Sequence, residues 1–245
     1  VSARRPIAYF SSNEEIGDLS VSSSYDFFQF SIPEKHLPDN VAFVQGQING
    51  AHNFSKDFQL RIENLSTKKV SRVRVDRKTG KYTAVLSNGD ARDYLFSIES
   101  QDIGYTSTRV RLDKSQNDYV IPDLSAKKLE IGESFNLYSV LFESNSYVLS
   151  KKDEQALKSF ARYFKSHPAL IVELQGHTDN IGYSEDNLLL SENRSKAVFD
   201  FLINSGVDSR QISYQGFGDK YPLDSNDTEI GRSKNRRTVF IILSI

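Results

Sequence analysis

Three polar side chains that could bind one small ligand lie in the stretch 174–194, LQGHTDNIGYSEDNLLLSENR. Asp179 follows an apolar segment and a glycine, so its carboxylate is expected on a turn at the end of a strand. Asn187 and Arg194 are seven positions apart, and two turns of helix would place them on one face. A ligand with both an ammonium and a carboxylate group would satisfy Asp179 and Arg194 together.

Each of these side chains also has a purely structural interpretation. Asp179 could accept hydrogen bonds from local backbone amides, as aspartates on turns do. Arg194 could pair with Glu192 or a solvated carboxylate, and Asn187 could cap or start the helix. Thr178 could serve only to stabilise the turn. The local sequence leaves both interpretations open.

Catalytic and metal chemistry have little support. His177 and Asp179 lie close in sequence, but no second His lies within reach and the chain has 0 Cys. No Ser lies in a GxSxG-like elbow. Glu143 and Asp179 could in principle form the carboxylate pair of a glycan hydrolase, although nothing singles them out. We predict no catalytic residue, no metal and no cofactor.

Composition and charge exclude several classes of protein. The chain has 245 residues, of which 38% are hydrophobic and 26% charged, as in ordinary globular proteins. The net charge of −1 provides no general attraction to nucleic acid or to an anionic membrane. With 0 Met and a start at Val1, we expect a fragment or processed product. Membrane association would be indirect, or through a lipid anchor outside this sequence.

Residues 126–245 alternate between strand and helix patterns. Ser150 and Asp153 can cap a first helix, which His167-Pro168 ends. A second helix runs toward Gly206. The predicted strands are 135–142, 169–175, 211–217 and 237–243. This order predicts two helices on one face of a mixed four-stranded sheet.

Residues 38–125 have an all-β pattern and predict a small β-sandwich. The expected strands are VAFVQGQI, FQLRIENL, VSRVRVD, GKYTAVL, DYLFSIE and TSTRVRLD, with Asn-Gly and similar turn signals between them. A charged connector at 123–133 is the expected boundary with the α+β part. Residues 1–37 contain two further expected strands, 7–11 and 26–32, in a segment too small to bury its own core.

Five motifs in residues 135–245 resemble the OmpA C-terminal-like family, which anchors to peptidoglycan. They are VLFESNSYVL, GHTDNIG, NLLLSENRSKAVFDFL, QISYQGFGDKYP and GRSKNRR, in the family's order. The resemblance implies that Asp179 binds the ammonium and Arg194 the α-carboxylate of diaminopimelate in the stem peptide. It also implies that Arg236 faces the ligand.

The remaining candidate ligand-binding residues come from the same resemblance. They are Asn187, Thr178 and Asn145, and Asn145 could equally be a turn residue. Segments of 38–125 resemble the carboxypeptidase regulatory-like sandwich, and 1–37 is similar to the last of a set of propeller-forming repeats. This domain order is similar to PorE-type proteins of the type IX secretion system.

Together these patterns predict a non-enzymatic protein that anchors an envelope assembly to the cell wall. The expected location is the periplasm of a Gram-negative bacterium, in association with the outer membrane. The expected partners are the peptidoglycan stem peptide and envelope or secretion-system proteins, and not nucleic acid. The alternatives are a cell-wall hydrolase and a structural adaptor with a vestigial pocket.

Overall fold

The computed structural model describes residues 7–12, 26–31, 41–54, 58–87, 89, 92–100, 102–113, 118–121, 123–137 and 139–245. Ile7–Ser12 (β1) and Asp26–Ser31 (β2) pair in antiparallel register, so the two expected N-terminal strands are present. The side chains of this pair lie outside the described residues, so the expected resemblance to a propeller repeat stays a prediction. No helix in the described part of the chain is long and apolar enough to cross a membrane.

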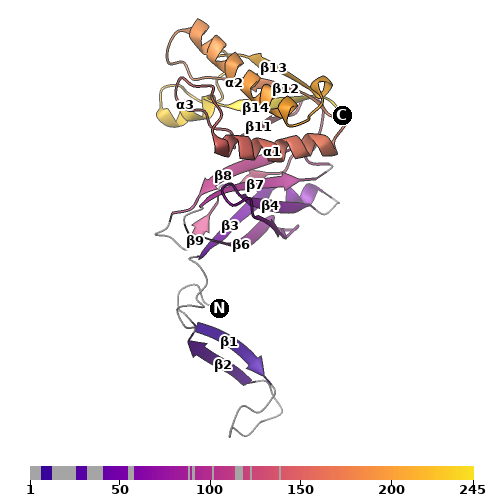
Figure 1. The fold of residues 1–245 in the computed structure, drawn as a ribbon, viewed down its shortest axis with the longest axis vertical. Helices are drawn as coiled ribbons and strands as arrows, with labels where there is room; N and C mark the ends of the chain where they lie inside the picture. The colour runs from indigo at the N-terminus through magenta and orange to yellow at the C-terminus, as the bar shows by residue number, and fades with distance from the viewer. Residues whose placement is uncertain are drawn as a thin grey trace.

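The segment from residue 41 to residue 125 forms two sheets (Figure 1). The first contains β3 (Val41–Asn49), β6 (Lys81–Ser87), β9 (Asp118–Val120) and β10 (Leu124–Ser125). The second has the order β5 (Val70–Val73), β4 (Gln59–Asn64), β7 (Asp93–Glu99) and β8 (Thr106–Arg111), all antiparallel. All six strands expected from the sequence are present. The short strands β9 and β10 were not expected.

The two sheets pack face to face over one hydrophobic core. Alternate residues of β3 and β6, such as Val44 and Leu86, belong to the same buried cluster as Leu60 and Phe96 from β4 and β7. In β6 the alternation places one row of side chains in the core and the other in solvent, whereas residues 93–98 of β7 are buried on both faces. A 3-10 turn, Ala51–Asn53, follows β3.

The third sheet belongs to the C-terminal part and has the mixed, four-stranded arrangement that the sequence predicts. Its order is β11 (Ser134–Asn136), β14 (Thr238–Ser244), β12 (Ile171–Gly176) and β13 (Ile212–Gly216). Only β12 and β13 run parallel to each other. The 3-10 turn Ser209–Gln211 (η3) leads into β13.

Helices α1 (Lys151–Ser166) and α2 (Ser184–Asn204) cover one face of the third sheet. Ser150 and Asp153 form the predicted capping box at the start of α1. Helix α2 crosses the sheet so closely that a Cβ on Gly176 would lie 2.1 Å from the Ser191 carbonyl oxygen. The lack of a side chain at Gly176 therefore allows α2 to pack closely against the end of β12.

Two expectations for this part were wrong. The strand predicted over 135–142 ends at Asn136, because only Ser134–Asn136 pairs with β14. After Asn136 the chain leaves the sheet and forms a loop. A third helix, α3 (Glu229–Asn235), was not predicted, because its seven residues carry no apolar periodicity.

Helix α1 lies between its own sheet and the second sheet (Figure 1). Ala156 packs in one small cluster with Leu65 and Leu95 of that sheet. Tyr105, just before β8, is fully buried in the C-terminal core with its ring centroid 4.8 Å from that of Phe160. The two parts of the chain therefore share apolar packing across α1.

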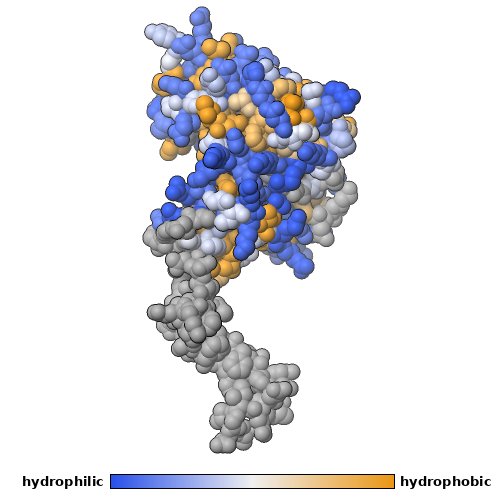
Figure 2. All heavy atoms as spheres, in the orientation of Figure 1, coloured by the Kyte–Doolittle hydropathy of each residue, from blue (hydrophilic) through white to orange (hydrophobic). Residues whose placement is uncertain are grey.

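Charged side chains also cross this junction. The Glu63 carboxylate lies 3.2 Å from Arg162 and accepts a hydrogen bond of 2.5 Å from Gln155. Arg109 lies 3.1 Å from Asp153, and Lys152 lies 2.7 Å from Asp93. Figure 2 shows mostly hydrophilic side chains on the surface around the junction between the second sheet and α1, with smaller apolar patches between them.

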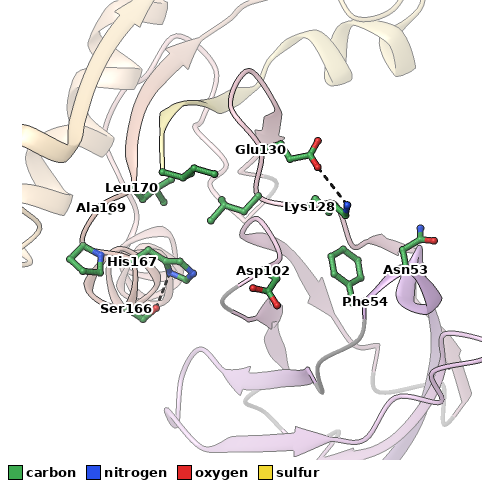
Figure 3. Close-up of a pocket in the computed structure, with 12 residues that line it drawn as sticks. Asn53, Phe54, Asp102, Lys128, Glu130, Ser166, His167, Ala169 and Leu170 are labelled. Carbon is green, nitrogen blue, oxygen red and sulfur yellow. Dashed lines mark hydrogen bonds and ion pairs between the residues drawn. The ribbon is translucent and has the colours of Figure 1, made fainter.

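A cavity of about 600 Å³ opens where α1 ends beside the first two sheets (Figure 3). Phe54 lines it from the segment after β3, and His167 and Leu170 line it from the end of α1 and the start of β12. At its rim, Lys128 and Glu130 form an exposed ion pair of 3.7 Å.

Candidate functional site

A second cavity, of about 500 Å³, lies at the C-terminal end of β12. The turn after β12, the loop 142–145, helix α2 and helix α3 form its walls. Its lining includes all six binding residues predicted from the sequence: Asn145, Thr178, Asp179, Asn187, Arg194 and Arg236. Phe142, Glu143, Ser144, Ile181, Leu190, Glu229 and Arg232 complete it. We call this space the ligand cavity.

Asp179 lies on the turn after β12 and is 8% exposed. One carboxylate oxygen, Oδ1, accepts a hydrogen bond of 3.1 Å from the Ile181 amide, as the structural interpretation expects. The other, Oδ2, accepts one of 2.6 Å from Nη1 of Arg236. Asp179 is thus held by its own turn on one side and by a partly exposed cation on the other.

Arg194 lies on α2 and is 6% exposed. Its Nε and Nη2 donate to the carbonyl oxygens of Ser146 and Glu143, at 2.9 and 3.0 Å. Its guanidinium carbon lies 5.4 Å from the centre of the Phe142 ring. The suggested pairing with Glu192 is therefore wrong, because the guanidinium is turned into the loop after β11.

Burial lowers the pKa of Arg194, and the nearby charge of Asp179 partly opposes that shift. The guanidinium nevertheless stays charged at neutral pH, because arginine starts from a very high pKa. Among the described residues, Nη1 of Arg194 makes no hydrogen bond. This leaves one fixed, charged donor of Arg194 unused in a partly buried cavity.

Asn187 fixes the turn that carries Asp179. Its Nδ2 donates to the carbonyl oxygens of Asp179 and Ile181, at 3.3 and 3.1 Å. The helix cap is Tyr183, so the suggestion that Asn187 itself caps α2 is wrong. Asn187 and Arg194 line the same cavity, as their spacing of seven residues predicts.

The predicted binding residues Thr178 and Asn145 differ in burial, since Thr178 is buried and Asn145 is exposed. Thr178 is 4% exposed, and its Oγ1 has no hydrogen-bond partner among the described residues. Asn145 is exposed and has a φ of 52°, a left-handed conformation that asparagine adopts more readily than most residues. The backbone of Asn145 therefore supports its interpretation as a turn residue.

Helix α3 adds Glu229 and Arg232, which sequence reasoning did not assign to the site, beside the predicted Arg236. Arg236, just after α3, bridges Asp179 and Glu229, with 2.6 Å to each carboxylate. These two acids raise the pKa of Arg236, while Arg236 and Arg232 lower the pKa of Glu229. Arg232 lines the cavity and donates to the Asn226 carbonyl at 2.8 Å.

The ligand cavity thus contains three carboxylates and three guanidinium groups. The acids are Glu143, Asp179 and Glu229, and the bases are Arg194, Arg232 and Arg236. A purely anionic or cationic ligand would meet repulsion from half of them, whereas a zwitterion could pair with both kinds. Within the described residues, no group of three His, Cys, Asp or Glu side chains could hold a metal ion.

Comparison with known proteins identifies a family for this part of the chain. Residues 141–236 match the OmpA family. The probable lipoprotein YiaD of Escherichia coli is 36% identical over 99 residues, which are 40% of this chain and 45% of YiaD. The peptidoglycan-binding protein ArfA of Mycobacterium tuberculosis is 35% identical over 103 residues, 42% of this chain and 32% of ArfA.

The match is confined to the C-terminal part, and it spans less than half the length of these curated relatives. Among solved structures, the peptidoglycan-associated lipoprotein of Burkholderia pseudomallei is 31% identical, covering 43% of this chain and 88% of that one, with a TM-score of 0.39. The family match places an OmpA-like domain in the C-terminal part of the chain.

Proposed function

From the match of residues 141–236 to the OmpA family, we propose that this chain binds peptidoglycan non-covalently through the ligand cavity. The ligand is the diaminopimelate residue of the stem peptide. The names of relatives such as the peptidoglycan-binding protein ArfA support the polymer, and the mixed charge of the cavity supports a zwitterionic residue.

The observation that carries this proposal is the convergence of six side chains predicted from separate motifs. They come from the loop after β11, the turn after β12, helix α2 and the end of α3, and they line one cavity. The most distant pair, Asn145 and Arg236, is 91 positions apart in the sequence (236 − 145). Structural needs in four unrelated segments would not by themselves direct these side chains into one space.

Arg194 is the group we assign to the α-carboxylate of the ligand. Two of its nitrogens are fixed by backbone carbonyls, so the remaining donor has a defined direction before the ligand arrives. Such preorganisation lowers the conformational entropy lost on binding.

Asp179 is the group we assign to the ammonium of the ligand. It is paired with Arg236 in the structure, and the Arg236 side chain is 37% exposed. An incoming ammonium would share or displace this guanidinium, which Glu229 can keep at 2.6 Å. Arg236 would thereby keep Asp179 paired until the ligand binds.

Co-sedimentation with purified sacculi tests the proposal. We expect wild type to sediment with sacculi and Asp179→Ala to remain in the supernatant. Asp200→Ala is the matched control, since Asp200 is an exposed aspartate on α2 whose ion pair within the described part of the chain is with Lys196. Equal sedimentation of Asp179→Ala and Asp200→Ala would refute the assignment of the cavity.

The proposal also assigns a role to residues 38–125, which precede the OmpA-like domain. We propose that the two sheets of residues 38–125 are the regulatory-like sandwich the sequence resembles, and that they connect the OmpA-like domain to an envelope assembly of the type IX secretion kind. The order of the segments supports this element. Cross-linking of the full chain in envelopes, followed by identification of the partners, tests it.

A further inference from the structure

The face of the third sheet opposite to α1 and α2 carries a separate cavity of about 390 Å³. Alternate residues of β12 and β14, such as Gln175 and Val239, form its floor, because strand neighbours point to opposite faces. The segment after β13 forms one side. The residues that line this cavity include Gln175, His177, Phe217, Tyr221, Leu223 and Arg237. We call this space the sheet-face cavity.

A small space of about 220 Å³ has lining residues in common with both the sheet-face cavity and the ligand cavity. It shares Phe142, Arg194 and Arg236 with the ligand cavity. It shares His177 and Arg237 with the sheet-face cavity. Since the same side chains border each neighbouring pair of spaces, a ligand larger than one amino acid that follows the protein surface could contact both the ligand cavity and the sheet-face cavity.

His177 lies in the wall between these spaces and has an unusual environment. It is 3% exposed and stacks on Phe217 with the ring centroids 5.6 Å apart, yet neither ring nitrogen has a hydrogen-bond partner among the described residues. Burial and the nearby Arg237 lower its pKa to about 4, so the ring is neutral at neutral pH. A neutral imidazole offers one donor and one acceptor.

The rim of the sheet-face cavity exposes apolar surface. Tyr221 is 60% exposed and Leu223 is 57% exposed. Tyr221 also meets Phe217 edge to face, with the ring centroids 5.5 Å apart. Arg237 donates to the Tyr221 carbonyl at 3.1 Å and so fixes this segment beside the sheet.

We propose that the sheet-face cavity is a saccharide subsite, which binds the N-acetylated sugar that bears the stem peptide. This inference rests on the proposed function of the ligand cavity. An exposed aromatic ring can pack against the apolar face of a sugar, and amide groups such as that of Gln175 match its hydroxyl and acetamido groups. His177 provides a donor and an acceptor beside that position.

The length of a stem peptide is compatible with this arrangement. An extended chain covers roughly 3.3–3.6 Å per residue, so a few residues suffice to link two cavities that share walls through one small space. A sugar suits the sheet-face cavity better than an anionic peptide segment does, because Arg237 is its one charged lining residue among the described residues.

Calorimetric titration of the full chain with two ligands tests this subsite. One ligand is the diaminopimelate stem peptide alone, and the other is the same peptide joined to its disaccharide. We expect wild type to bind the disaccharide peptide about 3- to 10-fold more tightly, the range for one aromatic contact. Tyr221→Ala should remove this gain and leave the affinity for the free peptide unchanged, whereas Tyr221→Phe should retain most of the gain.

A matched pair of leucine variants provides the control. Leu223→Ala should reduce the gain, whereas Leu243→Ala should not, because Leu243 is 48% exposed but does not line the sheet-face cavity. Equal wild-type affinity for the two ligands, or a gain that survives in Tyr221→Ala, would overturn the subsite while leaving the ligand cavity intact. Failure of wild type to bind either ligand would instead refute the proposed function, and with it the subsite.

Discussion

The junction around α1 and the ligand cavity use the same kinds of charged residue in different ways. At the junction, the carboxylate of Glu63 is 3% exposed and faces Arg61, Arg162 and Gln155 together. In the ligand cavity, Arg194 is bound by backbone carbonyls and keeps an unused donor, while Asp179 is held by the Ile181 amide and by one partly exposed guanidinium.

This difference distinguishes a structural charge from a binding charge. A buried charge that is fully paired within the protein stabilises one arrangement of the chain and has no capacity left for a ligand. A buried charge with an unused donor, or with a partner that can move, costs some stability and retains affinity for a ligand. We therefore expect substitutions at the junction to change stability, and those in the cavity to change binding.

The largest expected effect on stability is that of Glu63→Ala. Removing this buried acid takes an acceptor from the Gln155 amide and from the partly buried Arg61, so the free energy of unfolding should fall by about 1–3 kcal/mol. Urea unfolding measures this change. Binding of the stem peptide by the protein that remains folded should be unchanged.

Glu130→Ala is the control for this prediction. Glu130 pairs with Lys128 at 3.7 Å, but both side chains are at least 60% exposed, so its loss should cost less than about 1 kcal/mol. If Glu63→Ala lowered the free energy of unfolding no more than Glu130→Ala does, the charges at the junction would not be structural in the sense proposed.

His177 should make the domain sensitive to acid. Its pKa is about 4 in the folded state and about 6.5 in the unfolded chain, so the unfolded state binds more protons between these values. The stability that the neutral ring contributes is fully present above pH 6.5 and is lost as the pH falls to about 4. In His177→Gln, thermal unfolding should show a smaller loss of stability over that window, and an identical loss would contradict this prediction.

Asn145 should show the smallest effects. Because its φ of 52° suits glycine, Asn145→Gly should leave stability within about 0.5 kcal/mol, whereas Asn145→Val should cost about 1–2 kcal/mol. Affinity for the stem peptide should change less than twofold in Asn145→Gly. A tenfold loss there would show that the side chain contacts the ligand directly.

Much of the fold could be predicted from local sequence signals. Ser150 and Asp153 specify the start of α1, and the alternation in residues 41–111 specifies the strands. The error at 135–142 has a cause outside the segment: an apolar segment resembles a strand, but its Leu141 amide donates to the Asp153 side chain of α1 at 3.2 Å instead of to a neighbouring strand. The boundary of the C-terminal domain at residue 126 stays a prediction, and Tyr105 of the preceding segment is buried in the same core.

The candidate site could be predicted only in part. The spacing of Asn187 and Arg194 places them on one face, but the pairing of Arg236 with Asp179 joins positions 57 apart and has no local signal. Arg232 and Glu229 were missed because α3 is short and polar. The junction was missed for the same kind of reason, since Glu63 and Arg162 are 99 positions apart.

Calorimetric titration of a diaminopimelate stem peptide into wild type, Asp179→Ala, Arg194→Lys and the double variant tests the central claim most directly. A charge-assisted hydrogen bond contributes about 1.5–3 kcal/mol, so each single substitution should weaken binding roughly 10- to 150-fold. Arg194→Lys keeps the charge but loses the planar donor. Because both groups hold one ligand, the double variant should lose less than the sum of the single losses. Wild-type affinity in Asp179→Ala would contradict the claim that this cavity binds the stem peptide.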